Sequence, residues 1–272
     1  MKKRRFFCSL SLLLLILLSF SNPVNAGELF RVKQVYDGDT VLLEDGRKVR
    51  YLGINSPESL EPFFLKAKRL NESLVLRKKI RLEFDQEQMD AYHRLLAYVY
   101  IGNQMINAAM VREGLAHVFF IGPNRKYQSL LLQAQAEAKK SKVGFWSVGG
   151  RSKDLKISNV HLGDPEKPDP YSPYVRIVNL SQGPTRLLGH TLSNEGGEKY
   201  FFPDISLDPG TTVIVVSDAG KDGFDERGQA VVHWPAQKKV WDAKEDTAFL
   251  VDPCGAVIDQ FHYKGKKNPR PR

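Results

Sequence analysis

The chain has 272 residues, and without its first 26 it remains long enough for two domains. Its 40 Lys and Arg exceed its 31 Asp and Glu, for a net charge of +9 that is distributed unevenly along the chain. One of its two cysteines falls within the first 26 residues, which excludes an intrachain disulfide in the remainder. Its six scattered histidines lack the spacing of a zinc site.

The first 26 residues have the pattern of a secretory signal peptide. Four basic residues after Met1 precede the apolar run Phe6–Phe20, and Val24 and Ala26 occupy the −3 and −1 positions of a small-residue cleavage site. The apolar run is too short for a membrane-spanning helix, and no later stretch is long enough. We therefore expect cleavage after Ala26 and export to the medium, a periplasm or the cell surface; a retained N-terminal anchor is the alternative.

Charge divides the remaining chain into three parts. Residues 27–154 carry 21 Lys and Arg against 15 Asp and Glu, a net of +6 that suits a polyanionic partner. Residues 155–263 carry 10 against 16, a net of −6, and residues 264–272 add five basic residues. The sequence predicts a first domain at 27–147 and a small-residue linker at 148–154. A second domain follows at 155–263, and a basic tail at 264–272.

The first domain centres on a predicted hairpin. Two runs of alternating apolar and polar residues, 40–43 and 48–54, flank an Asp-Gly pair, which is a strong hairpin signal. Pairing of the runs brings Asp39, before the first strand, close to Asn55 and Glu58, at the end of the second. Such a cluster of oxygen ligands suits a Ca²⁺-like ion, although an ordinary hairpin with polar turns explains the same pattern.

The rest of the first domain alternates strands and helices. Alternation predicts strands, and apolar residues at three- and four-residue spacing predict helices. Five strands with inserted helices are typical of a closed barrel of the OB type, which binds oligonucleotides across one face. Besides the hairpin, the predicted strands are Leu29–Tyr36, Lys79–Phe84 and Arg94–Ile101, and the predicted helices are Phe63–Leu76, Met105–Glu113 and Arg125–Ser141.

Charged residues in this domain suit phosphodiester hydrolysis. That reaction develops negative charge on the phosphoryl oxygens, so it needs cations, a metal ion and a base for the attacking water. Arg50 and Arg94 suit the cations because a guanidinium matches phosphate oxygens and stays protonated. Glu58 suits the base, and Asp39 the anionic metal ligand. Taken singly, each arginine is more often a surface or ion-paired residue and Glu58 a helix-start carboxylate.

These motifs resemble the staphylococcal nuclease (thermonuclease) family. The resemblance spans about residues 29–147 and implies a five-stranded OB barrel with three helices. It further implies a Ca²⁺-dependent endonuclease that acts on DNA and RNA and leaves 3′-phosphates. The matching segments are Asp37–Val41, Arg50–Glu58, Asp90–Tyr98 and Asn107–Ala116.

The resemblance also implies roles for individual residues. It gives catalytic Arg50, Glu58 and Arg94, metal-binding Asp39 and Asn55 with the carbonyl of Ser56, and Tyr92 in contact with a nucleotide phosphate. Phe119 and Phe120 lie where the family places aromatics that stack a base, with core packing as the alternative.

Three features depart from the family pattern. Position 55 is Asn where the family usually has Asp; this removes a negative charge and predicts weak calcium binding, on the order of 10⁻⁴–10⁻³ M. The second arginine is flanked by His93 and Leu95 rather than glycines. The segment between Glu58 and Lys79 is shorter than in the best-known member. None of these departures removes a catalytic group.

The second half is predicted to be an all-β sandwich, because short alternating runs are separated by Pro, Gly and Asp turns. The order of Tyr174–Ser181, Leu187–Leu192, Leu207–Thr211 and Thr247–Gly255 resembles the lamin-tail domain, an immunoglobulin-like sandwich, and implies no chemistry. Its acidic composition argues against nucleic-acid binding by the sandwich itself. The predicted strands are Tyr174–Asn179, Gly189–Ser193, Tyr200–Phe202, Thr211–Ser217, Thr247–Val251 and Val257–Phe261.

The sequence thus predicts an exported, metal-assisted phosphodiesterase that cuts DNA or RNA. Two alternatives remain. A barrel that has lost its metal through Asn55 would bind single-stranded nucleic acid or an oligosaccharide without cutting it. A cell-surface adhesion protein would depend on an unknown ligand of the sandwich.

Overall fold

The structure is a computed structural model, and the predicted signal peptide, most of the linker and most of the basic tail lie outside its described residues. Among the helices of the described part, none has the length and apolar character needed to cross a membrane. The described residues are 28–59, 61–147, 154–163, 171, 173–236 and 239–264.

The first domain is a β-barrel, as predicted. Its sheet has the order β3-β2-β1-β5-β6-β7, and β3 also pairs in parallel with β6, which closes the barrel. Alternate residues of the strands point inward, and Val32, Val49 and Val99 have no exposed surface. The strands are β1 (Leu29–Val35), β2 (Thr40–Leu43), β3 (Lys48–Tyr51), β5 (Lys79–Glu83), β6 (Leu95–Ile101) and β7 (Gln104–Met105).

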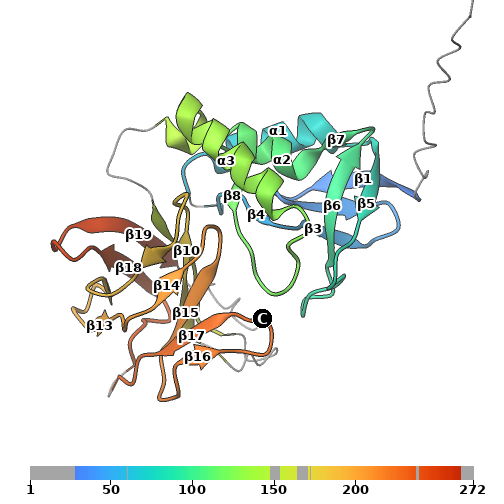
Figure 1. Ribbon diagram of the computed structural model, residues 1–272. Helices are drawn as coiled ribbons and strands as arrows, with labels where there is room; N and C mark the ends of the chain where they lie inside the picture. The colour runs from blue at the N-terminus through green and yellow to red at the C-terminus, as the bar shows by residue number, and fades with distance from the viewer. Residues whose placement is uncertain are drawn as a thin grey trace, which may run out of the picture.

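Three helices lie together on one side of this barrel (Figure 1). Each buries an apolar stripe against the strands or another helix, as the spacing of Ala67 and Val75 or of Leu131 and Ala134 requires. A short pair, β4 (Ile54–Asn55) with β8 (His117–Val118), lies outside the main sheet. The helices are α1 (Phe64–Val75), α2 (Ile106–Arg112) and α3 (Gln128–Ser141), and a 3₁₀ turn follows at Gly144–Trp146.

The second domain is an all-β sandwich, again as predicted. A five-stranded sheet, β16-β17-β15-β10-β9, and a four-stranded sheet, β13-β12-β18-β19, enclose a second hydrophobic core. A further pair joins β11 to β14. The strands are β9 (Leu155–His161), β10 (Tyr174–Asn179), β11 (Thr185–Arg186), β12 (Thr191–Ser193), β13 (Lys199–Phe201), β14 (Ser206–Leu207), β15 (Thr212–Val216), β16 (Gly223–Phe224), β17 (Ala230–His233), β18 (Glu245–Val251) and β19 (Val257–Lys264).

Five strands of this domain were not predicted from the sequence: β9, β11, β14, β16 and β17. The pairing of β9 with β10 shifts register at a bulge opposite Arg176 and Ile177, so the apolar positions of β9 do not alternate strictly. Three of the four residues of β17 are buried, and the strand lies between β15 and β16, which gives a continuous apolar run without alternation.

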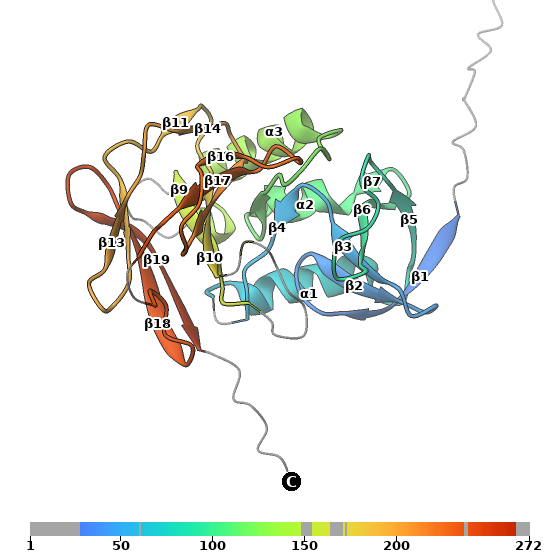
Figure 2. The ribbon, with the colours of Figure 1, turned by 90° about the horizontal axis from the view of Figure 1, so that it is seen from below.

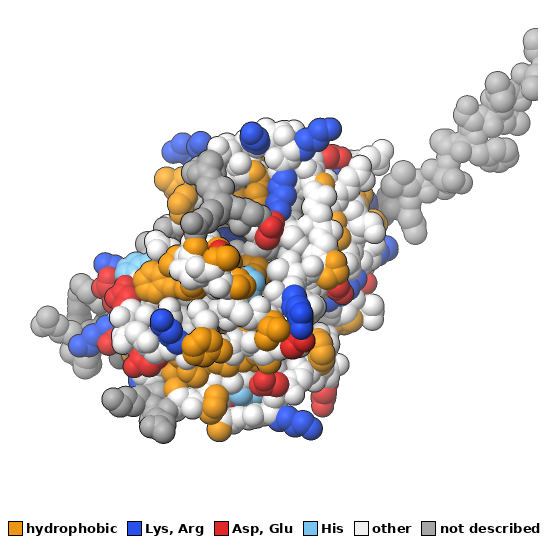
Figure 3. Space-filling view, turned by 60° about the vertical axis from the view of Figure 1, so that its left-hand side comes forward, with side chains coloured by type: hydrophobic (Ala, Val, Ile, Leu, Met, Phe, Trp, Pro, Cys, Tyr) orange, Lys and Arg blue, Asp and Glu red, His pale blue; other side chains and the backbone are white. Residues whose placement is uncertain are grey.

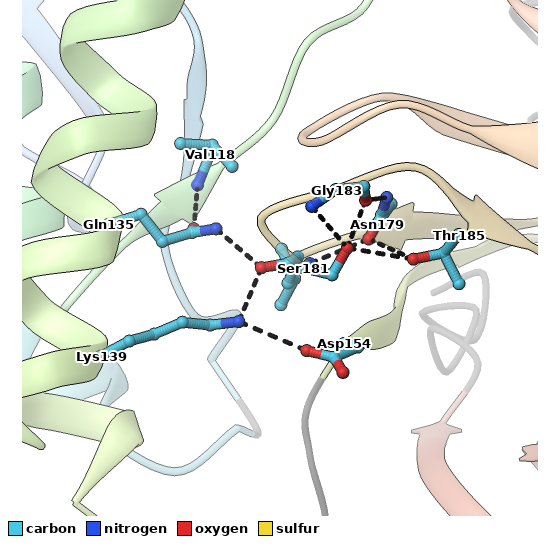
Figure 4. A network of polar contacts seen from close by, with 9 residues as sticks. Val118, Gln135, Lys139, Asp154, Asn179, Ser181, Gly183 and Thr185 are labelled. Carbon is cyan, nitrogen blue, oxygen red and sulfur yellow. Dashed lines mark hydrogen bonds and ion pairs between the residues drawn. The ribbon is translucent and has the colours of Figure 1, made fainter.

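The two domains contact each other directly, with β9 and β10 next to the first domain (Figures 1 and 2). Gln135 and Lys139 on α3 both donate hydrogen bonds to the carbonyl of Leu180, at 3.0 and 2.8 Å (Figure 4). The backbone N–H of Phe120 donates to the carbonyl of Gly210 at 2.8 Å. These contacts fix the face of the barrel that the sandwich covers.

Candidate active site

A glycine lets the loop before β2 approach the segment after β4. A Cβ atom at Gly38 would lie 2.6 Å from the Cβ of Ser56 and 2.9 Å from that of Ala67 on α1, so a larger residue does not fit. Next to it, Asp39 Oδ2 accepts a hydrogen bond from the backbone N–H of Ser56 at 2.5 Å. The two ends of the predicted hairpin therefore meet at Asp39.

Arg50 points from the outer side of β3 toward this meeting point. In β3 the inward side chains are Val49 and Tyr51, which leaves Arg50 on the opposite face. Its Nη2 donates to Asn55 Oδ1 at 2.8 Å, its Nη1 donates to the carbonyl of Tyr51 at 2.7 Å, and its Nε lies 3.2 Å from Asp39 Oδ1. A guanidinium has five N–H donors, so two of them have no acceptor among the described residues.

Asn71 forms a hydrogen bond with the loop that carries Asp37 and Asp39. It lies on the buried face of α1, between Ala67 and Val75, and has no exposed surface. Its Nδ2 donates to the carbonyl of Asp37 at 2.9 Å, and its Oδ1 accepts a hydrogen bond from the hydroxyl of Tyr51 at 2.9 Å. The sequence alone predicted no role for Asn71. Its amide lies within an apolar helical stripe, and this unusual position is the feature that could have indicated a buried polar contact.

Asn107 plays a similar part at the end of β3. It is fully buried on α2, donates to the carbonyl of Leu52 at 2.9 Å and accepts from the N–H of Val99 at 2.8 Å. It thus holds the turn after β3 against β6. Asn107 begins a segment that resembles the family, but its sequence context alone predicts no role for it.

Glu58 is an exposed residue, and its side chain lines a cavity. Its backbone N–H donates to Glu61 Oε2 at 2.8 Å, and its carbonyl accepts from the N–H of Glu61 at the same distance. The surrounding walls desolvate the carboxylate, and this effect, with the nearby charge of Asp39, raises the pKa of Glu58, while Arg50 opposes the shift. A carboxylate with a raised pKa is a better proton acceptor near neutral pH.

Asp90 orders the loop that carries Arg94. Its Oδ1 accepts hydrogen bonds from the N–H groups of Tyr92 and Arg94 at 2.9 and 3.0 Å, and its Oδ2 accepts from Arg94 Nε at 2.7 Å. His93 takes a left-handed backbone conformation, with φ of 58°, which is uncommon for a residue other than glycine. The Arg94 guanidinium lies 5.5 Å from the ring centroid of Tyr92.

The predicted catalytic side chains line one cavity of about 1820 Å³. Arg50, Glu58 and Arg94 contribute to it together with Asn55, Tyr92 and Phe119. Asp39 and Ser56 lie beneath it and are each 4% exposed.

Phe120 does not lie with this group. It is 2% exposed and packs in the barrel core, where a Cβ atom added at Gly210 would lie 2.5 Å from its ring and one added at Gly53 3.2 Å from it. A ring covered in this way has no face for a base. The alternative of core packing therefore describes Phe120, and among the two candidates Phe119 alone lines the cavity.

The oxygen atoms at the base of the cavity suit a hard cation. Burial, and after it the charge of Asp39, raises the pKa of Asp37 to about 7, while the charge of Arg50 opposes the shift. Asn55 Oδ1 adds a neutral oxygen ligand. In the described part of the chain no three His, Cys, Asp or Glu side chains form a metal cluster, so an ion here would be held by few charges.

Two known protein families match consecutive parts of the chain. Residues 48–148 match the family of staphylococcal nuclease homologues, and residues 150–265 match the Lamin Tail Domain. The thermonuclease of Staphylococcus intermedius is 39% identical over 129 residues, which are 44% of this chain and 77% of that protein. The chain belongs to the staphylococcal nuclease family.

Other members show the same relation. The thermonuclease of Staphylococcus hyicus is 38% identical over 133 residues, 45% of this chain and 79% of that protein. Endonuclease YncB of Bacillus subtilis is 38% identical over 125 residues, 42% of this chain and 59% of that protein. As a member of the staphylococcal nuclease family, the protein is a nuclease that hydrolyses phosphodiester bonds of nucleic acid.

Proposed function

We propose that this nuclease is an exported endonuclease that cleaves DNA and RNA with Ca²⁺ and leaves 3′-phosphates. The shared cavity of Arg50, Glu58 and Arg94 carries the proposal, because these groups can reach one phosphodiester only from a common site. Two relatives named thermonuclease and one named endonuclease support cleavage within a strand.

Glu58 acts as the base in this proposal. It takes a proton from a water molecule, whose oxygen attacks the phosphorus atom. The bond from phosphorus to the 5′ oxygen breaks, and that oxygen leaves as a hydroxyl after it takes up a proton. The phosphate stays on the 3′ oxygen of the preceding nucleotide.

The two arginines stabilise the charge that develops on the phosphoryl oxygens. Within the described part of the chain, Arg50 keeps two N–H groups for the substrate. Arg94 donates through Nε to Asp90, and its two terminal nitrogens donate no hydrogen bond to any described residue. Both guanidinium groups are oriented before substrate binds, which lowers the cost of reorganisation. Tyr92 lies beside Arg94 and contacts a substrate phosphate.

Calcium would be held by Asp39, Asn55 Oδ1 and the carbonyl of Ser56. When bound, the ion supplies positive charge to a phosphoryl oxygen. Asp39 and Asn55 now contact Arg50, and Asn55 carries no charge, so we propose that the ion binds weakly, on the order of 10⁻⁴–10⁻³ M.

The replacement Glu58→Gln tests the role of the base. It should lower kcat by roughly 10²–10⁴-fold, because the amide keeps the shape of the side chain but cannot accept the proton. Glu113→Gln, at an exposed residue after α2, is the matched control and should cleave DNA like the parent. If Glu58→Gln also digests DNA at the parent rate, another group is the base.

A digestion assay separates the enzyme from a binding module. Denatured DNA is incubated with the mature protein in the presence of calcium or of a chelator. Digestion that calcium supports and the chelator stops agrees with the proposal. Retention of DNA without digestion in calcium favours the binding module instead.

The proposal includes export and two domains. Cleavage after Ala26 would release residues 27–272, and the N-terminal sequence of protein recovered from the medium or periplasm tests this. The separate cores, from Val32 to Ala134 and from Leu155 to Tyr263, support domain boundaries near residues 148–154.

A further inference from the structure

Lys156 of the second domain reaches the loop that carries Glu58. It lies on β9, and its Nζ is 2.5 Å from Glu61 Oε1. The two side chains are 22% and 21% exposed, so the ion pair is largely shielded from solvent and salt. The contact joins residues 95 positions apart in the chain.

Glu61 extends this contact to the proposed base. While Oε1 contacts Lys156, Oε2 accepts the hydrogen bond from the N–H of Glu58. The N–H of Glu61 donates to the carbonyl of Glu58 in return. One residue therefore holds Glu58 at both of its backbone polar groups, and Lys156 holds that residue.

Neighbouring groups fix Lys156 itself. Its Nζ also donates to the carbonyl of Ile157 at 3.2 Å, and the N–H of Ile157 donates to Asp259 Oδ2 on β19 at 2.7 Å. Lys156 is thus an ammonium group near two carboxylates, those of Glu61 and Asp259. Both sheets of the sandwich contribute to its position.

The domain contacts made by Lys139 on α3 do not involve Glu61 or Glu58. Lys139 donates to the carbonyl of Leu180 and lies 3.5 Å from Asp154, where the chain enters β9 (Figure 4). Lys139 also joins the two domains through an ammonium group, but its partners are remote in sequence from Glu58. Replacing Lys139 would therefore change the domain contact and leave the contacts of the Glu58 loop in place.

We propose that Lys156 is a positioning residue for catalysis: through Glu61 it keeps Glu58 in the orientation that activates water. The lamin-tail-like domain therefore completes the active site of the nuclease domain. This inference rests on the proposed role of Glu58. Without Lys156, the partly buried Glu61 carboxylate loses its cation and no longer favours the present loop. Misplacement of a catalytic group lowers kcat more than it changes substrate binding.

Three variants of the full chain test the proposal with denatured DNA and calcium. Lys156→Met should lower kcat by about 10-fold, with KM within about twofold of the parent, because a small displacement of a reacting group is costly. Lys156→Arg should restore most of the rate. Lys139→Met should keep the parent kcat, and thermal unfolding confirms that each variant is folded. Equal losses of kcat in Lys156→Met and Lys139→Met would overturn the proposal.

A second comparison uses the Glu58→Gln background. If Lys156 acts through Glu58, Lys156→Met adds no further loss once Glu58 is replaced, because coupled residues are not additive. A further loss of about 10-fold in this background would show that Lys156 acts elsewhere. An inactive Glu58→Gln with a fully active Lys156→Met refutes this inference alone, whereas a fully active Glu58→Gln refutes the proposed function as well.

Discussion

Asp39, Asn55 and Arg50 form a small charge system in which one carboxylate and one amide oxygen share a single guanidinium. An Asn at position 55 gives this site one negative charge fewer than an Asp would. Its amide oxygen still accepts a hydrogen bond from Arg50. The site therefore has a low charge and an ordered arginine at the same time. Each property can be changed separately.

The replacement Asn55→Asp should strengthen calcium binding. The added carboxylate supplies a second charged ligand, so the calcium concentration for half-maximal activity should fall by about 10-fold or more. Calcium titration of DNA hydrolysis measures this value. Asn103→Asp, which adds the same charge at an exposed turn, should leave it unchanged. An unchanged titration curve in Asn55→Asp would mean that position 55 does not bind the ion.

At the scale of elements, the short pair of β4 and β8 places a neutral histidine beside the site. His117 is opposite Asn55 in this pair and 2% exposed, its Nδ1 donates to the carbonyl of Val118, and its Nε2 has no partner among the described residues. Burial, and then the charge of Lys156, lowers the pKa of His117 to about 3. The fold therefore requires the uncharged ring.

Acidification should destabilise the protein through His117. The unfolded chain protonates this histidine near pH 6.5 and the folded chain near pH 3, so the stabilisation is complete above pH 6.5 and is lost as pH falls toward 3. At pH 4.5 the loss is about 2–3 kcal/mol, from 1.36 kcal/mol per unit. Urea unfolding at pH 7 and 4.5 should show a smaller change for His117→Gln. His93→Asn, at an exposed histidine with left-handed backbone, should behave like the parent. Equal pH dependence in all three would contradict the assignment.

At the scale of the whole molecule, the upper and lower parts of the face in Figure 3 differ in their side chains. Lys and Arg side chains lie along the upper edge in Figure 3, at the height of the helices in Figure 1, and hydrophobic side chains gather lower, at the height of the sandwich. The domains meet closely where Gly210, with φ of 76°, packs against the ring of Phe120. This contact leaves no space for a side chain.

The replacement Gly210→Ala should therefore weaken the domain contact. The new Cβ would lie 2.5 Å from the Phe120 ring, which should cost about 1–3 kcal/mol beyond the backbone strain. Gly228→Ala has a similar φ of 73° with no atom within 4 Å of its Cβ, so it should show the strain alone, about 1 kcal/mol. Thermal unfolding measures both. Equal destabilisation by the two replacements would show that the ring moves without cost.

The sequence predicted the barrel and most of the sandwich because alternation and turn residues are local signals. It predicted the approach of Asp39 to Asn55 for the same reason, since a hairpin fixes it. It did not predict β9, whose bulge breaks the alternation, or the amides of Asn71 and Asn107, whose partners lie on other elements. The contact between Lys156 and Glu61 depends on how two domains pack, and no pattern within either domain encodes that arrangement.

The long separation of Glu61 and Lys156 in the chain has a consequence for biosynthesis. Synthesis proceeds from the N-terminus, so the barrel residues emerge from the ribosome well before Lys156. Under the proposed role of Lys156, a nascent nuclease domain lacks the partner that positions Glu58. On the same basis, we expect kcat to reach its full value only after the second domain has folded against the barrel.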